Sequence, residues 1–150
     1  MATYLSNELA GTTTGLSTSA GTGYKPRATV YGGRVKRLRA TVTLASQATT
    51  DVLLLGNLPA GATFAFGVIT NSVSLGSSTL AIGVSGTTGK YLTAGTATAT
   101  DTPTFFGNTA QVAASDVGLA TEEVVIGTIA SAALPSSGTL VVDLYYSIPN

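Results

Sequence analysis

Hydrophobic and polar residues alternate strictly between residues 37 and 44 of this 150-residue chain. One face of an extended segment would carry the apolar residues Leu38, Ala40, Val42 and Leu44, and the other would carry Arg37, Arg39, Thr41 and Thr43. Because successive side chains of a strand point to opposite faces, this pattern predicts a half-buried β-strand.

Two more segments alternate in the same way. In residues 79–85 the expected inward side chains are Leu80, Ile82 and Val84, and in residues 139–147 they are Leu140, Val142, Leu144 and Tyr146. Residues 62–70 are apolar on both faces, and Phe64, Phe66 and Val68 are expected to share one of them. A strand of this kind belongs in the middle of a sandwich or under a subunit contact.

The remaining segments complete an all-β pattern. Short strands are expected at residues 51–55, 90–92, 104–106 and 122–129, and residues 110–120 fit either a short helix or a loop. About eight short strands separated by turn residues indicate a single β-sandwich or jelly-roll-like domain. We expect this domain at residues 27–150 and an extended N-terminal arm at residues 1–26.

The expected arm has a composition of its own. Gly, Ser and Thr dominate residues 11–23, with no sustained hydrophobic period. Such a segment is either a disordered leader or an arm that orders against a neighbouring molecule. Tyr4, Leu5 and Leu9 are apolar anchors that a purely flexible leader would not need, so we favour the arm.

Charge is scarce along the chain. Charged residues make up 9% of it, the formal net charge is zero and the mean hydropathy is +0.38. No apolar run approaches the roughly 18 residues that a membrane helix needs, so no membrane partner is expected. A surface that is neither charged nor in lipid is expected to be covered largely by other protein chains.

Few residues are suited to catalysis. The chain has no cysteine and no histidine, which removes the commonest metal ligand and general base. The adjacent Glu122 and Glu123 would point to opposite faces of a strand, and Asp101 and Asp116 stand in turn contexts. We therefore expect no enzyme activity, no cofactor and no metal site.

The basic residues are concentrated in one segment. Six of the seven lie between residues 25 and 39, and they are Lys25, Arg27, Arg34, Lys36, Arg37 and Arg39. This segment could meet an acidic surface, on another copy of the chain or on a different partner. It could equally place solvated charges along an edge strand. A nucleic-acid site is less favoured, because only Tyr24 and Tyr31 are interleaved as aromatic residues.

Two stretches carry a resemblance to a known family. Residues 55–95, LGNLPAGATFAFGVITNSVSLGSSTLAIGVSGTTGKYLTAG, and residues 138–147, GTLVVDLYYS, resemble small tailed-phage virion proteins that decorate, or cement, capsids. The similar features are the "LPAGA" turn before an apolar strand, the "TLAIG" strand, "KYL" and the closing "VVDLYY" strand. The match covers roughly residues 50–147 and leaves the arm outside.

The resemblance implies a structural role. Such a protein is a β-sandwich or jelly roll that oligomerises, most often as a homotrimer, and binds the major capsid protein on the outside of the capsid. It links neighbouring capsomers and has no catalytic residues. The implied location is the capsid surface of the virion, after synthesis in the host cytoplasm, with no nucleic-acid or membrane partner.

We expect the capsid or partner contact in the arm and the basic segment, at Tyr4, Leu5, Leu9, Lys25, Arg27, Arg34, Lys36, Arg37 and Arg39. Three alternatives stay open. The first is another virion component, such as a head-fibre or tail protein. The second is a carbohydrate-binding β-sandwich with Tyr31, Tyr91 or Tyr145 as outward platforms. The third is a nucleic-acid binder that uses residues 25–39.

Overall fold

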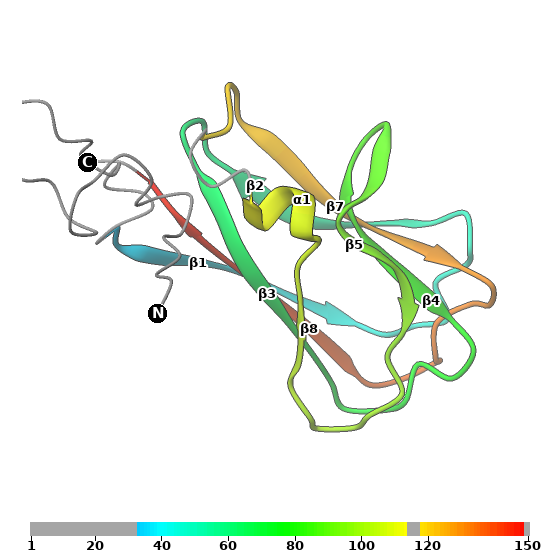
Figure 1. The fold of residues 1–150 in the computed structure, drawn as a ribbon. Coiled ribbons are helices and arrows are strands. Elements are labelled where there is room, and N and C mark those ends of the chain that lie inside the picture. The colour runs from blue at the N-terminus through cyan, green and yellow to red at the C-terminus, as the bar shows by residue number, and fades with distance from the viewer. Residues whose placement is uncertain (1–32, 114–117, 149–150) are drawn as a thin grey trace, which may run out of the picture.

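The computed structural model describes residues 33–113 and 118–148, which form eight strands and one short helix (Figure 1). The strands are β1 (Val35–Thr43), β2 (Val52–Leu58), β3 (Thr63–Asn71), β4 (Thr79–Val84), β5 (Thr87–Thr96), β6 (Thr104–Phe106), β7 (Glu123–Ala130) and β8 (Thr139–Ser147). The helix is α1 (Thr109–Ala113), which overlaps the start of the segment 110–120 for which the sequence left helix and loop open.

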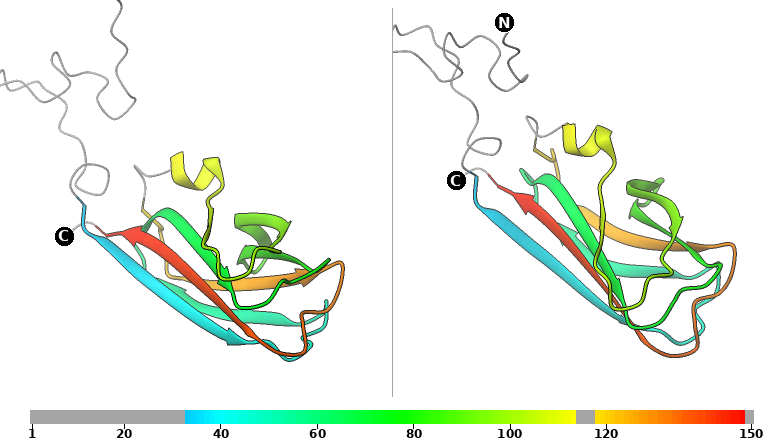
Figure 2. Two further views of the ribbon diagram at one scale, coloured as in Figure 1. Left: turned by 90° about the horizontal axis from the view of Figure 1, so that it is seen from below. Right: turned by 60° about the horizontal axis from the view of Figure 1, so that its bottom comes forward.

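The strands form two antiparallel sheets, which Figure 2 shows as separate layers. Sheet A has the order β1-β8-β3-β6, and sheet B has the order β2-β7-β4-β5. The first strand pairs with the last, β2 with β7, β3 with β6 and β4 with β5. A long hairpin folded over in this way is a jelly roll. The predicted all-β sandwich is therefore confirmed.

The core lies between the two sheets and follows the predicted alternation. Leu140, Val142 and Leu144 of β8 are 0% exposed, and Leu80 and Ile82 of β4 are 1% and 0% exposed. Ala40 and Leu44 of the β1 segment are also buried, whereas Arg37, Arg39 and Thr41 are exposed. Because these inward side chains are apolar and closely packed, their burial drives the association of the two sheets.

Strand β3 departs from the prediction. Its pairing with β8 shifts register between Phe64 and Phe66, so Ala65 is an extra residue in the strand. Such a bulge reverses the alternation that follows it. Phe64 consequently points into the core at 5% exposure, and Phe66 points outward at 36%. The expectation that Phe64 shares a face with Phe66 and Val68 is wrong.

A second bulge explains why β2 is longer than expected. The register between β2 and β7 shifts between Leu54 and Gly56, and the strand then continues to Leu58. Gly56 has a φ of 139°, in a region that favours glycine. Leu58, the first residue of the "LPAGA" turn, therefore belongs to β2, and the turn lies in the residues that follow it.

The two ends of the sandwich differ. Val35 pairs with Ser147, so the start of β1 and the end of β8 lie side by side at one end, which we call the terminal pole (Figure 1). At the opposite end, backbone hydrogen bonds join the loops, including Leu44 N to Gly138 O and Leu134 N to Gln47 O, each 2.9 Å. The loops that connect the two sheets there support one another.

Candidate partner-contact surface

The outer face of sheet A carries aromatic side chains on three neighbouring strands. Tyr145 of β8 lies opposite Phe66 of β3, and Phe105 of β6 lies opposite Val68 of β3. The ring centroids of Phe66 and Tyr145 are 4.6 Å apart, and those of Phe66 and Phe105 are 5.9 Å apart. Phe105 is 72% exposed. We call Tyr145, Phe66 and Phe105 the aromatic row.

The geometry of the aromatic row favours a protein partner. The planes of Phe66 and Tyr145 differ by 18°, so each ring covers one face of the other. Sugars and nucleobases stack on open ring faces. Exposed clusters of large aromatic side chains are instead typical of protein contacts, where such residues are enriched. The stacked Phe66 and Tyr145 therefore offer less open ring surface to a sugar or a base, and with the exposed Phe105 they form an apolar cluster of the kind that protein contacts contain.

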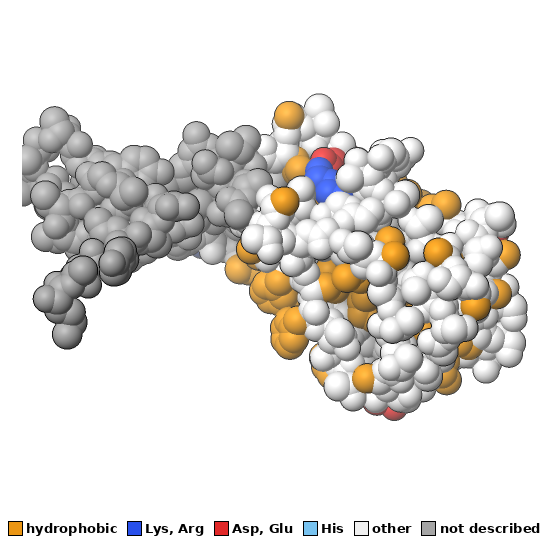
Figure 3. All heavy atoms as spheres, turned by 45° about the vertical axis from the view of Figure 1, so that its right-hand side comes forward, with side chains coloured by type: hydrophobic (Ala, Val, Ile, Leu, Met, Phe, Trp, Pro, Cys, Tyr) orange, Lys and Arg blue, Asp and Glu red, His pale blue; other side chains and the backbone are white. Residues whose placement is uncertain are grey.

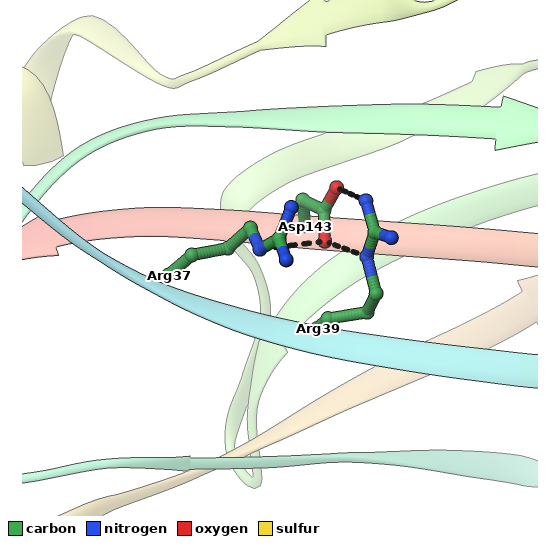
Figure 4. Close-up of polar contacts among 3 residues, drawn as sticks. All are labelled: Arg37, Arg39 and Asp143. Atoms are coloured by element: carbon green, nitrogen blue, oxygen red, sulfur yellow. Dashed lines mark hydrogen bonds and ion pairs between the residues drawn. The ribbon is translucent and has the colours of Figure 1, made fainter.

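Two arginines of β1 flank one carboxylate of β8 (Figure 4). Arg39 lies opposite Asp143 in the register and donates from Nε at 2.8 Å and from Nη2 at 2.6 Å. Nε of Arg37 lies 4.0 Å from the same carboxylate. Arg37 itself is opposite Tyr145, which connects the arginines to the row.

In the group of Arg37, Arg39 and Asp143, positive side chains outnumber negative ones. The hydrogen bonds from Arg39 lower the pKa of Asp143, and the positive charges of Arg39 and Arg37 add to this effect against the opposing effect of desolvation. The same hydrogen bonds raise the pKa of Arg39. Asp143 and Arg39 are therefore ionised near neutral pH, and one carboxylate faces two guanidinium groups. A net positive charge remains at this side of the aromatic row.

The predicted contact residues do not all lie on one described surface. Arg37 and Arg39 join the outer face of sheet A, on which the aromatic row lies. Arg34 and Lys36 are exposed, but Lys36 lies on the side of β1 that carries Leu38, which packs against the core. Five further predicted residues, Tyr4, Leu5, Leu9, Lys25 and Arg27, lie outside the described residues.

Sequence reasoning missed part of this surface. The alternation of residues 139–147 placed Asp143 and Tyr145 outward, and the structure has them on the outer face. Nothing in the sequence indicated that they would meet Phe66, because the bulge at Ala65 that turns Phe66 outward leaves no pattern of its own. The adjacent Phe105 and Phe106 differ in exposure, because Phe106 is 8% exposed in the core and Phe105 is 72% exposed on the outer face.

A second polar cluster lies between β5 and β7. The Lys90 Nζ donates to Glu123 Oε1, and the Tyr91 hydroxyl donates to Glu123 Oε2 at 2.6 Å. Burial, together with the hydrogen bond and charge of Glu123, raises the pKa of Tyr91, so its hydroxyl stays protonated. Both carboxylate oxygens are engaged within the chain, and the cluster therefore ties the two strands together.

The structure also tests the three proposed tyrosine platforms. Tyr91 is 1% exposed, so the expectation that it forms an outward sugar platform is wrong. Tyr145 is half-buried and stacks on Phe66. Tyr31 lies outside the described residues.

Residues 33–113 and 118–148 contain no group of three or more Asp, Glu, His or Cys side chains that could hold a metal ion. Among them there is also no helix long and apolar enough to cross a membrane. The face shown in Figure 3 carries few charged side chains and several exposed hydrophobic ones.

The fold of this chain also occurs in solved structures of other proteins. The sequence matches no known family model and no curated protein. The structure is similar to a chain of the cyanophage Pam1 capsid asymmetric unit, with a TM-score of 0.64 and 22% identity over 89% of this chain and 98% of that one. The fold is one that phage capsids contain.

Two other solved structures agree with this finding. A chain from the capsid of Ralstonia phage GP4 matches with a TM-score of 0.62 and 19% identity over 79% of this chain and 86% of that one. A chain from the acid-stable capsid of Helicobacter pylori bacteriophage KHP30 matches with a TM-score of 0.56 and 15% identity, over 77% and 89%. At these identities the likeness is one of fold.

Proposed function

We propose that this protein is a structural component of a phage virion that binds the outside of the capsid and stabilises it by linking neighbouring capsomers. The observation that carries the proposal is the match to the cyanophage Pam1 capsid, which covers 98% of the matched chain. The likeness therefore extends over a whole small chain and is not confined to one domain of a larger protein. The partner would be the major capsid protein, and the protein would act at the virion surface.

The physical properties of the chain suit this role. A protein that binds only the assembled shell stabilises it by mass action, and an oligomer with several contacts gains avidity without any chemistry. Charged residues make up 9% of the sequence, and exposed aromatic side chains are available on sheet A. Both features favour dry, tightly packed contacts with other proteins.

The contact with the shell is proposed in two parts. The first is the arm, residues 1–26, with Tyr4, Leu5 and Leu9 as apolar anchors. The second is the basic segment, Lys25, Arg27, Arg34, Lys36, Arg37 and Arg39, extended by the aromatic row. The net positive charge beside Asp143 would be complemented by a carboxylate on the shell surface.

The test uses shells that lack the protein, mixed with purified protein and sedimented. Wild-type protein should co-sediment with the shells and raise the temperature at which they open. A chain without residues 1–26 should stay folded and lose this binding, because its apolar anchors are gone. If the truncated chain still decorates shells at wild-type occupancy, the role assigned to the arm is wrong. If the wild-type protein ignores shells, the proposed function is wrong, and a head-fibre or tail component becomes the better interpretation.

The basic segment is tested separately. Replacing Arg34, Lys36, Arg37 and Arg39 with glutamine should weaken shell binding about tenfold at low salt and less at high salt, because exposed ion pairs are weak and screened. The matched control replaces Asp51 and Asp101, which lie in loops, with asparagine. Binding that neither the glutamine variant nor salt alters would show that these charges only solvate an edge strand.

A further inference from the structure

The outer face of sheet B carries a second exposed apolar surface, opposite in the sandwich to the aromatic row. Val52 and Leu54 of β2 are 56% and 71% exposed, and Val124 of β7 is 48% exposed. Leu54 lies opposite Ile126 of β7, which is half-buried, so the apolar side chains continue from one strand to the next. We call Val52, Leu54, Val124 and Ile126 the aliphatic face.

The two sheets differ sharply in charge. The strands of sheet B contain two charged residues, Lys90 and Glu123, and these bind each other. The strands of sheet A contain three basic residues and one acidic residue, Asp143. Among the described residues near the aliphatic face, the charges lie at strand ends, with Asp51 just before β2, Glu122 just before β7 and Glu123 at the start of β7. An apolar centre with charges at its margin is the usual anatomy of a protein interface.

The strands of sheet B contain no charge apart from the Lys90–Glu123 pair, and this indicates what kind of partner the face fits. In a symmetric oligomer, residues near the axis meet their own copies. A charged residue there would face a like charge, so such a surface is best when it carries none. Sheet A, with its excess of arginine and lysine, would repel itself, whereas the aliphatic face would not. Of the two faces, the aliphatic one is therefore suited to contact between copies.

The edge strands support the same assignment. Strand β1 is one edge of sheet A, with the three-residue strand β6 at the other, and it carries Lys36, Arg37 and Arg39. Charges of this kind prevent edges from associating. Strand β2 is the corresponding edge of sheet B, and its sequence VLLLGNL contains no charge. An edge strand with exposed apolar side chains and no charge is prone to association. A second copy of the chain would cover it.

We infer that the aliphatic face is the interface between copies of this chain, arranged around a symmetry axis with Leu54 closest to that axis. Self-association of the chain can be tested independently of its binding to the capsid. It leaves the outer face of sheet A and the arm free for the shell.

The first experiment uses the absence of cysteine from the chain. The variant Leu54→Cys places one thiol at the proposed axis, and Phe105→Cys places one on a side chain of nearly equal exposure, 72% against 71%, on the other sheet. Under mild oxidation the first variant should give covalent dimers on a denaturing gel, and the second should remain at the mass of one chain. Crosslinking of both at equal rates, of neither, or of the Phe105 variant alone would overturn the inference.

The second experiment measures mass and shell binding together. Leu54→Ser should stay folded, because the side chain is exposed within one copy, and its mass by light scattering should fall to that of the single 14.9 kDa chain. Phe105→Ser should keep the wild-type mass and lose affinity for shells. An unchanged mass for Leu54→Ser, or a wild-type protein that is monomeric, would contradict the inference. Wild-type oligomers that dissociate in the Leu54 variant but never bind shells would support it and refute the capsid role.

Discussion

At the scale of single residues, Asp143 holds an unusual position because its carboxylate is almost buried on an outer sheet face. The side chain is 9% exposed, whereas those of Arg37 and Arg39 are 49% and 50% exposed. A nearly buried carboxylate is tolerated because charged donors satisfy it. The pair also joins β1, an edge strand, to β8 through side chains as well as through the backbone ladder.

We expect Asp143→Asn to lower the free energy of unfolding by about 1–2 kcal/mol, because charge-assisted hydrogen bonds contribute modestly when one partner is half-exposed. Arg39→Met should cost more than Arg37→Met, since only Arg39 donates two hydrogen bonds to the carboxylate. Urea unfolding of the three variants measures these differences. Equal losses for the two arginine variants would show that the paired geometry of Arg39 contributes nothing.

Acid should remove the same contribution. Because the pKa of Asp143 is lowered in the folded state, its stabilisation is present above the ordinary aspartate value of about 3.9. It is lost as the pH falls through the lower folded value. The unfolding free energy of the wild type should therefore fall more steeply below about pH 4 than that of Asp143→Asn. Parallel acid profiles for the two proteins, measured by urea unfolding, would contradict this.

At the scale of elements, β3 joins the short edge strand β6 through a position that admits only glycine. A Cβ atom built on Gly67 would lie 2.0 Å from Cζ of Phe106, whose ring lies over the glycine. Gly67 is opposite Phe106 in the register, and Phe106 is 8% exposed, so the ring has little room to move. The missing side chain allows the ring to complete the core beneath β6.

Gly67→Ala should therefore destabilise the fold by about 1–3 kcal/mol, the usual cost of overpacking a core. The matched control is Gly95→Ala on β5, where the nearest atom to an added Cβ is the Thr93 oxygen at 3.8 Å. The control should leave the midpoint of thermal unfolding nearly unchanged. A Gly67 variant as stable as the control would mean that Phe106 repacks without loss.

The elements also show what the sequence could predict and what it could not. Regular alternation identified β1, β4 and β8 and the direction of their side chains, because a period of two follows directly from strand geometry. The bulge at Ala65 was not predicted, because an extra residue in an apolar stretch disturbs no visible pattern. The candidate surface depended on that bulge and on the pairing of β3 with β8, neither of which is local in the sequence.

At the scale of the whole molecule, the jelly roll makes the last strand essential. Strand β8 lies between β1 and β3 in sheet A, so it pairs on both sides. It also supplies Leu140, Val142 and Leu144, each of which is 0% exposed. Burial of such a side chain contributes about 1.5–3 kcal/mol, and a domain of this kind has a total stability of about 5–15 kcal/mol.

Removal of residues 139–150 should consequently abolish folding, because the lost burial is comparable to the whole stability of the domain. Removal of residues 149–150 alone is the control and should leave the fold intact. Circular dichroism and thermal unfolding distinguish the two results. A cooperative transition in the longer truncation would show that the sandwich closes without its central strand.

Because Val35 pairs with Ser147, the two poles of the sandwich are not equivalent. The first and last strands begin and end at the terminal pole, while the loops of the opposite pole are joined to one another. Ala99 is exposed in the loop between β5 and β6, next to Thr100, which bridges to Asn71 at the far end of β3. If the terminal pole faces the shell, this loop points to the medium around the virus particle. A peptide inserted at Ala99 would then be displayed outward on the particle.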